Sequence, residues 1–96
     1  MSINIGLDVG AVSLKLAAIG SLDDGPPFRS LTEKSETFYL ATFPDSSLFA
    51  GRPLVMSRYR RLQGSLIQST FDLLEEFYDH VPEESVEGIR VTGFGS

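Results

Sequence analysis

Alternation of apolar with polar or small residues is the main pattern along this chain. From Ile3 to Val9 every second residue is aliphatic, which is typical of a strand with one buried face. A second apolar run, at 13–19, is too short for a stable helix, and the segments 54–61 and 86–93 alternate again. The pattern therefore predicts four core strands.

One segment, between Ser65 and Pro82, has helical periodicity. Ser65 is suited to cap the first amides of a helix, and Pro82 is suited to end it. The apolar residues between them form a wide stripe, which is typical of a helix packed on a sheet. They are Leu66, Ile67, Phe71, Leu73, Leu74, Phe77 and Tyr78. We expect this stripe to face the core.

The order strand, strand, strand, helix, strand predicts an α/β fold with a mixed sheet. Two hairpin-like links followed by a right-handed crossover give the spatial order 3-2-1-4, with the fourth strand parallel to the first. The helix would cover one face of the sheet and leave the other bare. Because the chain also stops directly after a strand-like run, we expect residues 1–96 to be the N-terminal part of a larger protein.

The segment 20–53 interrupts this pattern with turn-forming residues, among them Asp-Gly and Pro-Pro. Such dipeptides favour turns and loops, so we expect a loop-rich insertion here. Within it, the aromatic and apolar segment 38–43 is compatible with an added strand or with a packed loop.

Charge argues against a nucleic-acid partner. Eight basic and thirteen acidic residues give a formal charge of −5, which repels a polyanion unless the basic residues cluster. Arg58, Arg60 and Arg61 do not form such a cluster, because alternation along a strand splits them between two faces. We therefore expect residues 58–61 to form an exposed strand face, and we expect no nucleic-acid binding.

The chain contains no cysteine, so it holds neither a disulfide framework nor a thiolate metal site. Its start has no basic and apolar leader, and no window reaches the roughly 20 apolar residues of a membrane helix. These features predict a cytoplasmic protein without a membrane partner.

The stretch GLDVGAVSLK, residues 6–15, is the main candidate for chemistry. It places Asp8 at the end of one strand, Gly10 in a turn, and Ser13 and Lys15 at the start of the next strand. Amides that converge in such a turn can bind an anionic oxygen, and a glycine allows close approach. Asp8 could hold a hydrated Mg²⁺, while Lys15 neutralises charge.

The same residues are compatible with an ordinary hairpin, in which Asp8 accepts hydrogen bonds from the turn and Lys15 is solvated. Neither GxxxxGK nor GxGxxG occurs in the chain. A Walker-type loop and a dinucleotide-binding fingerprint are therefore excluded.

A family resemblance favours the phosphate interpretation. IGLDVGAVSLKLAAI, residues 5–19, resembles the first phosphate loop of the actin, heat-shock ATPase and sugar kinase superfamily, whose domains are ribonuclease H-like. The run from Arg58 through RRLQGSLIQSTFDLLEEF to IRVTGFGS is most similar to the ATPases that activate 2-hydroxyacyl-CoA dehydratases and benzoyl-CoA reductases. The resemblance implies the same strand order as the one predicted above.

The resemblance also implies site residues. Asp8 would be the catalytic carboxylate and would hold Mg²⁺ through water. Ala11 stands where relatives usually have a hydroxyl residue, so backbone amides would bind more of the phosphate. The positions expected to bind nucleotide are Gly10, Ala11, Val12, Ser13, Lys15, Thr92, Gly93 and Gly95.

By the same resemblance, the parent protein would bind ATP and Mg²⁺ and act as a homo-oligomer. Hydrolysis would drive electron transfer from an iron–sulfur cluster, held downstream of this chain, to a dehydratase or reductase component. Phosphoryl transfer needs groups from several elements, so this piece alone is expected to be inactive. A small-molecule kinase of the same superfamily and a non-enzymatic actin-like scaffold, such as a pilus assembly protein, are the alternatives.

Overall fold

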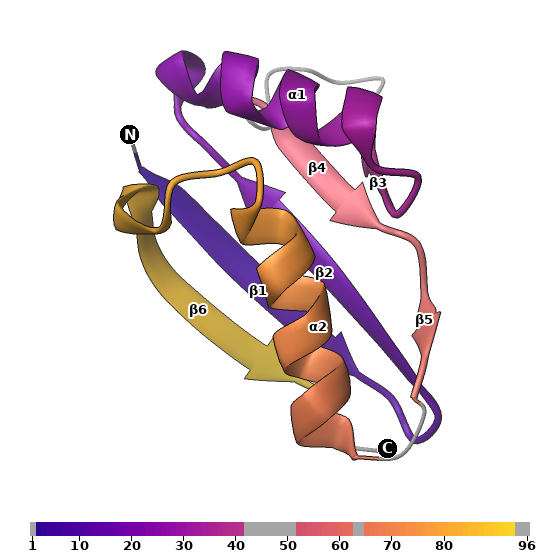
Figure 1. Ribbon diagram of the computed structural model, residues 1–96. Coiled ribbons are helices and arrows are strands. Elements are labelled where there is room, and N and C mark those ends of the chain that lie inside the picture. Colours follow the sequence, from indigo (N-terminus) through magenta and orange to yellow (C-terminus); the bar gives the residue numbers. More distant parts are fainter. Residues whose placement is uncertain (1, 42–51, 63–64, 94–96) are drawn as a thin grey trace.

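The first two strands form the hairpin around which the molecule is built (Figure 1). The computed structural model describes residues 2–41, 52–62 and 65–93. In it β1 (Ile3–Val9) and β2 (Ser13–Ile19) pair antiparallel along their length. Both ranges agree with the strands predicted from the alternation of apolar residues.

The remaining strands extend this hairpin on both sides. On one side β6 (Val86–Thr92) runs parallel to β1. On the other side β4 (Leu54–Ser57) and β5 (Arg60–Arg61) both pair antiparallel with β2, and β3 (Phe38–Leu40) pairs with β4. The result is a six-stranded mixed sheet of order β3-β4-β2-β1-β6, with β5 beside β2.

The predicted four-strand order is wrong for the sheet as a whole, although the expected pairings of β1 with β2 and β6 are present. Two features cause the difference. The short segment Phe38–Leu40 adds an edge strand, and the segment 54–61 is two strands because Arg58 and Tyr59 leave the ladder between them. The prediction of a general α/β class is confirmed.

The expected loop-rich insertion at 20–53 is wrong for its first part, which contains the helix α1 (Gly25–Lys34). Pro26 and Pro27 lie in its first turn, where a missing amide hydrogen costs nothing because that amide has no helical acceptor. Phe28 and Leu31 anchor the helix in the core. Residues 42–51 lie outside the described part of the chain.

A short 3₁₀ turn, η1 (Leu22–Asp24), leads into α1. The Asp24 carboxylate is buried, and it accepts hydrogen bonds from the backbone amide and the hydroxyl of Ser21, both at 2.8 Å. A third donor is the backbone amide of Ser2, at 3.3 Å. Asp24 thus ties the start of α1 to the beginning of the chain.

The second helix, α2 (Leu66–Tyr78), begins as predicted, since the Ser65 hydroxyl accepts a hydrogen bond from the Gln68 amide at 3.1 Å. Its apolar stripe is only partly buried. Ile67 is 69% exposed and Phe71 is 62% exposed. The prediction that these two residues are buried in the core is wrong, because both line an open apolar groove between α2 and the strands β1 and β6, which leaves them exposed.

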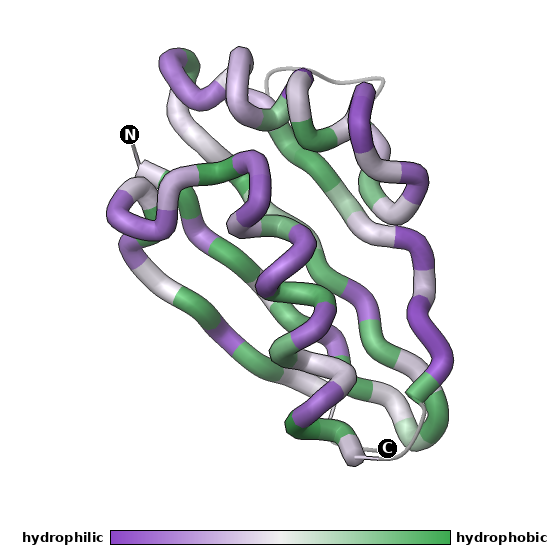
Figure 2. Tube along the Cα trace, in the orientation of Figure 1, coloured by the Kyte–Doolittle hydropathy of each residue, from purple (hydrophilic) through white to green (hydrophobic). Residues whose placement is uncertain are grey.

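One hydrophobic core joins both helices to a single face of the sheet. The Phe77 ring of α2 lies 6.3 Å from the Phe28 ring of α1 and 5.9 Å from the Phe38 ring of β3, measured between centroids. After α2, a 3₁₀ turn, η3 (Glu83–Ser85), leads into β6. Figure 2 shows the alternation of hydrophobic and hydrophilic positions along the strands that accompanies this one-sided packing.

The opposite face of the sheet is open, as the sequence predicts. Asn4, Gly6 and Asp8 of β1 are exposed, while the residues between them are buried. Polar groups placed on this face are therefore accessible to a ligand.

Candidate functional site

Three of the predicted site residues lie in one row on the open face of the sheet. Asp8 of β1 is the direct partner of Lys15 on antiparallel β2 and of Thr92 on parallel β6. Residues paired in this way point to the same face of a sheet. A carboxylate thus lies between an ammonium group and a hydroxyl group.

This row borders a concave pocket of about 330 Å³. Its floor lies two pairs further along the strands, at the next pair on the same face, where Gly6 and Ala17 are partners and leave the sheet uncovered by large side chains. The complete lining is Gly6, Leu7, Asp8, Lys15, Ala17, Met56, Tyr59, Arg90 and Thr92. Two cationic side chains and one carboxylate surround the hollow, so it can accommodate a ligand that bears anionic groups together with a cation.

Gly93 follows Thr92 at the end of β6 and lies against the end of β1, next to Asp8. Its φ of 97° is a conformation that side chains rarely adopt. A Cβ at this position would lie 2.9 Å from Asp8 Oδ1 and would overlap the Val9 carbonyl oxygen. Only glycine therefore fits between the end of β6 and the end of β1. Gly95, the other predicted glycine, lies outside the described residues.

The hairpin turn between β1 and β2 lies beside this row. The Gly10 amide donates a hydrogen bond to the Ser13 carbonyl oxygen at 2.8 Å. This bond stabilises the turn and occupies the amide. Ala11 and Val12 are exposed, and within the described ranges their amides have no hydrogen-bond acceptor. Phosphate binding by the amides of the turn remains a prediction, with Ala11 and Val12 as the available donors.

Tyr59 and Arg90 were not predicted as part of this site. Tyr59 lies in the interruption between β4 and β5, is 64% exposed, and has the Lys15 ammonium 4.8 Å from its ring centroid. The sequence signal was an aromatic residue among arginines, which was interpreted as an exposed strand face. Arg90 is the partner of Gly6, and this register could not be read from the sequence.

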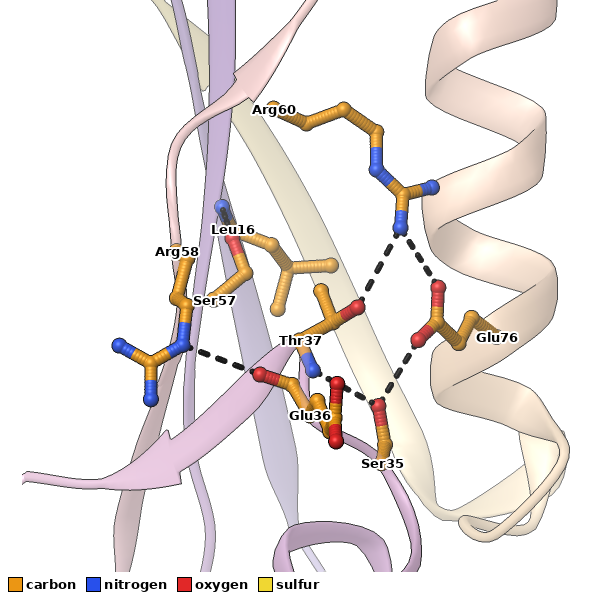
Figure 3. Close-up of polar contacts among 8 residues, drawn as sticks. All are labelled: Leu16, Ser35, Glu36, Thr37, Ser57, Arg58, Arg60 and Glu76. Carbon is orange, nitrogen blue, oxygen red and sulfur yellow. Dashed lines mark hydrogen bonds and ion pairs between the residues drawn. The ribbon is translucent and has the colours of Figure 1, made fainter.

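Two anchors on either side of Tyr59 are drawn in Figure 3. Before it, the buried Ser57 hydroxyl accepts a hydrogen bond from the Leu16 amide at 2.8 Å. After it, the Arg60 guanidinium forms an ion pair with Glu76 of α2 at 2.7 Å. The predicted exposed strand face at residues 58–61 is therefore wrong for Arg60, which joins the sheet to a helix.

Glu76 also accepts a hydrogen bond from the Ser35 hydroxyl at 2.8 Å (Figure 3). Its burial by itself raises the pKa of the carboxyl group. Hydrogen bonds from Thr37, Arg60 and Ser35 outweigh this effect, and the pKa of Glu76 lies below its ordinary value. Glu76 is thus held as a carboxylate that links α1, α2 and β5.

The pocket fits Mg²⁺ only as a partly hydrated ion. Among the described residues no cluster of three or more metal-ligating side chains occurs, and in the same ranges the Asp8 carboxylate has no hydrogen-bond or ion-pair partner. A single free carboxylate suits Mg²⁺, which commonly keeps several waters and binds phosphate oxygens. Lys15 and the exposed turn amides are suited to those phosphates.

The fold and the pocket define a mixed α/β domain with a hollow on its open face, bordered by the polar side chains of Asp8, Lys15, Arg90 and Thr92. Comparison of the chain with family models, curated proteins and solved structures gives no match. Neither described helix has the length and apolar character needed to cross a membrane. The assignment of a ligand thus rests on the geometry of the pocket and on the resemblance of the loop.

Proposed function

We propose that this chain forms part of a magnesium–nucleotide site in a ribonuclease H-like ATPase of the actin type. The observation that supports this most directly is the row of Thr92, Asp8 and Lys15 across three neighbouring strands. The proposal extends to the activator ATPases of 2-hydroxyacyl-CoA dehydratases and benzoyl-CoA reductases, on the strength of the resemblance in the loop and in the segment from Arg58 onward.

Each residue of the row has a separate task in this proposal. Asp8 orients the hydrated Mg²⁺ and thereby the phosphates. Lys15 neutralises charge on the phosphate oxygens, and the amides of Ala11 and Val12 donate hydrogen bonds to them. Thr92 offers a hydroxyl group at the opposite side of Asp8. With Gly93, these groups supply one wall of a phosphate site.

Bound Mg²⁺ would polarise the terminal phosphate for attack by water, which releases ADP and inorganic phosphate. The chain's own residues bind and orient, and the groups that would position the water lie beyond this chain in the proposal. The iron–sulfur cluster is also placed elsewhere, since this chain has no cysteine. Its proposed partners are a nucleotide, a second copy of the protein and the dehydratase or reductase component.

The test is the affinity of the full-length protein for MgATP, measured by isothermal titration. Asp8→Asn keeps the size of the side chain but removes its charge, and we expect binding to weaken by about tenfold, which corresponds to about 1.4 kcal/mol. Asp72→Asn is the matched control, because Asp72 is an exposed carboxylate on α2. Equal affinity of wild type and Asp8→Asn would remove Asp8 from the site.

A further inference from the structure

Asp8 and Lys15 are placed to form an ion pair that the structure does not contain. They are direct cross-strand partners, and their side chains share the open face of the sheet. Opposite residues on antiparallel strands have Cβ atoms about 5 Å apart, which is within reach of a carboxylate and an ammonium group. Within the described residues, however, Lys15 contacts the Tyr59 ring, at 4.8 Å from the centroid, and Asp8 is unpaired.

The position of Tyr59 is fixed from both sides. Ser57 is fully buried and holds β4 against β2 through the Leu16 amide. The Arg58 amide then donates to the Thr37 carbonyl at 2.8 Å, and Arg60 is held by Glu76. These contacts turn the backbone at 58–59 out of the ladder and leave the Tyr59 ring over the pocket.

We propose that Tyr59 is a positioning residue that holds the Lys15 ammonium away from Asp8. The pocket then offers a free carboxylate for a divalent cation and, beside it, a cation for phosphate oxygens. Without the ring, Lys15 would turn to Asp8 and neutralise the carboxylate. A cation–π contact and an ion pair at exposed sites are of similar strength, so one aromatic ring can decide between the two positions.

The ligand in this inference rests on the proposed function, whereas the position of Lys15 does not. The position is read by NMR of the ligand-free protein, because ring currents shift protons that lie above an aromatic ring. We expect upfield-shifted ε-methylene protons of Lys15 in the wild type and in Tyr59→Phe, and ordinary shifts in Tyr59→Leu. Ordinary shifts in the wild type would overturn the inference.

The consequence for the site is read by titration with MgATP. We expect Tyr59→Leu to weaken binding by about two- to fivefold, the factor that an exposed cation–π contact supplies, and Tyr59→Phe to restore it. In a Lys15→Met background, where no ammonium competes for Asp8, the additional Tyr59→Leu change should have no effect. A loss that persists in this background would mean that Tyr59 acts on the ligand itself, and it would overturn the inference.

Tyr39→Leu is the matched control. The Tyr39 ring also lies under a cation, with the Arg58 guanidinium 5.5 Å from its centroid, but it does not line the pocket. We expect neither the Lys15 signals nor MgATP binding to change. If the wild type shows the shifted Lys15 protons but binds no MgATP, the proposed function fails while the positioning of Lys15 by Tyr59 stands.

Discussion

At the scale of single residues, Gly93 has little freedom to vary. Its positive φ and its contact with the end of β1 leave no space for a Cβ. We predict that Gly93→Ala lowers the free energy of unfolding by about 1–3 kcal/mol, the cost of forcing a side chain into such a conformation. Urea unfolding at neutral pH measures this loss.

Gly6→Ala is the control for this prediction. A Cβ on Gly6 would have its nearest neighbour, the Ala17 carbonyl oxygen, at 4.0 Å. We therefore expect Gly6→Ala to leave the stability unchanged or slightly raised, because alanine restricts the unfolded chain more than glycine does. A similar loss of stability in both variants would contradict the special role of Gly93.

Of the residues around the pocket, the sequence singled out Asp8 and Lys15 but neither Arg90 nor the aromatic Tyr59. Asp8 and Lys15 lie within one short motif, and alternation along two strands joined by a tight turn brings them to the same face. Tyr59 reaches this face only because the strand is interrupted there. The interruption follows a buried hydrogen bond between Ser57 and Leu16, which are 41 positions apart. No local sequence pattern predicts such an interruption.

At the scale of elements, the ion pair between Arg60 and Glu76 links a strand to a helix. It also makes the stability of the fold depend on pH. The pKa of Glu76 is lowered in the folded protein from its ordinary value of 4.5. The unfolded chain therefore takes up the proton first as the pH falls. The stabilisation is fully present above the ordinary value and is lost as the pH drops through the lower, folded value.

We predict that Glu76→Gln lowers the free energy of unfolding at pH 7 by about 1 kcal/mol, the upper range for a partly exposed pair. The difference from wild type should shrink as the pH falls from the ordinary value of 4.5 through the lower pKa of Glu76 in the folded protein. Urea unfolding across this range measures both effects. Glu75→Gln, on the exposed side of the same helix, should change the stability little, and a pH-independent difference for Glu76→Gln would contradict the assignment.

Among the elements, those with long regular patterns were predictable and those stabilised by distant contacts were not. β1, β2 and α2 follow from alternation and from the Ser65 cap. α1 was missed because its Pro-Pro start was interpreted as a loop, although proline suits the first helical turn. For the segment 38–43 the sequence left an added strand and a packed loop open; the structure has the strand β3, whose Phe38 is buried in the core.

At the scale of the whole molecule, one residue joins both helices to an edge of the sheet. Phe77 is fully buried, and its ring contacts Phe28 of α1, Phe38 of β3 and Tyr78 of its own helix. Both helices thus share one core with the sheet, and no helix has a separate core of its own among the described elements. The described parts should consequently unfold as a single unit.

Because the helices and the sheet share one core, we predict very different effects on stability for two phenylalanines of α2. Phe77→Ala should cost about 3–5 kcal/mol, as for other buried aromatic residues, and that is a large share of the roughly 5–15 kcal/mol that stabilises small domains. Phe71→Ala should change stability by only about 0.5 kcal/mol, since Phe71 is 62% exposed and lines a shallow apolar groove with Ile67 and Val91.

Thermal unfolding followed by circular dichroism tests both variants on the same helix. Coincident loss of helix and strand signals in Phe77→Ala is expected, because α1 and the sheet lose the same contact. If Phe71→Ala destabilised the protein as much as Phe77→Ala, the first turns of α2 would have to pack against the core. That outcome would contradict the exposed position of Phe71, and with it the reason given for the partly exposed stripe.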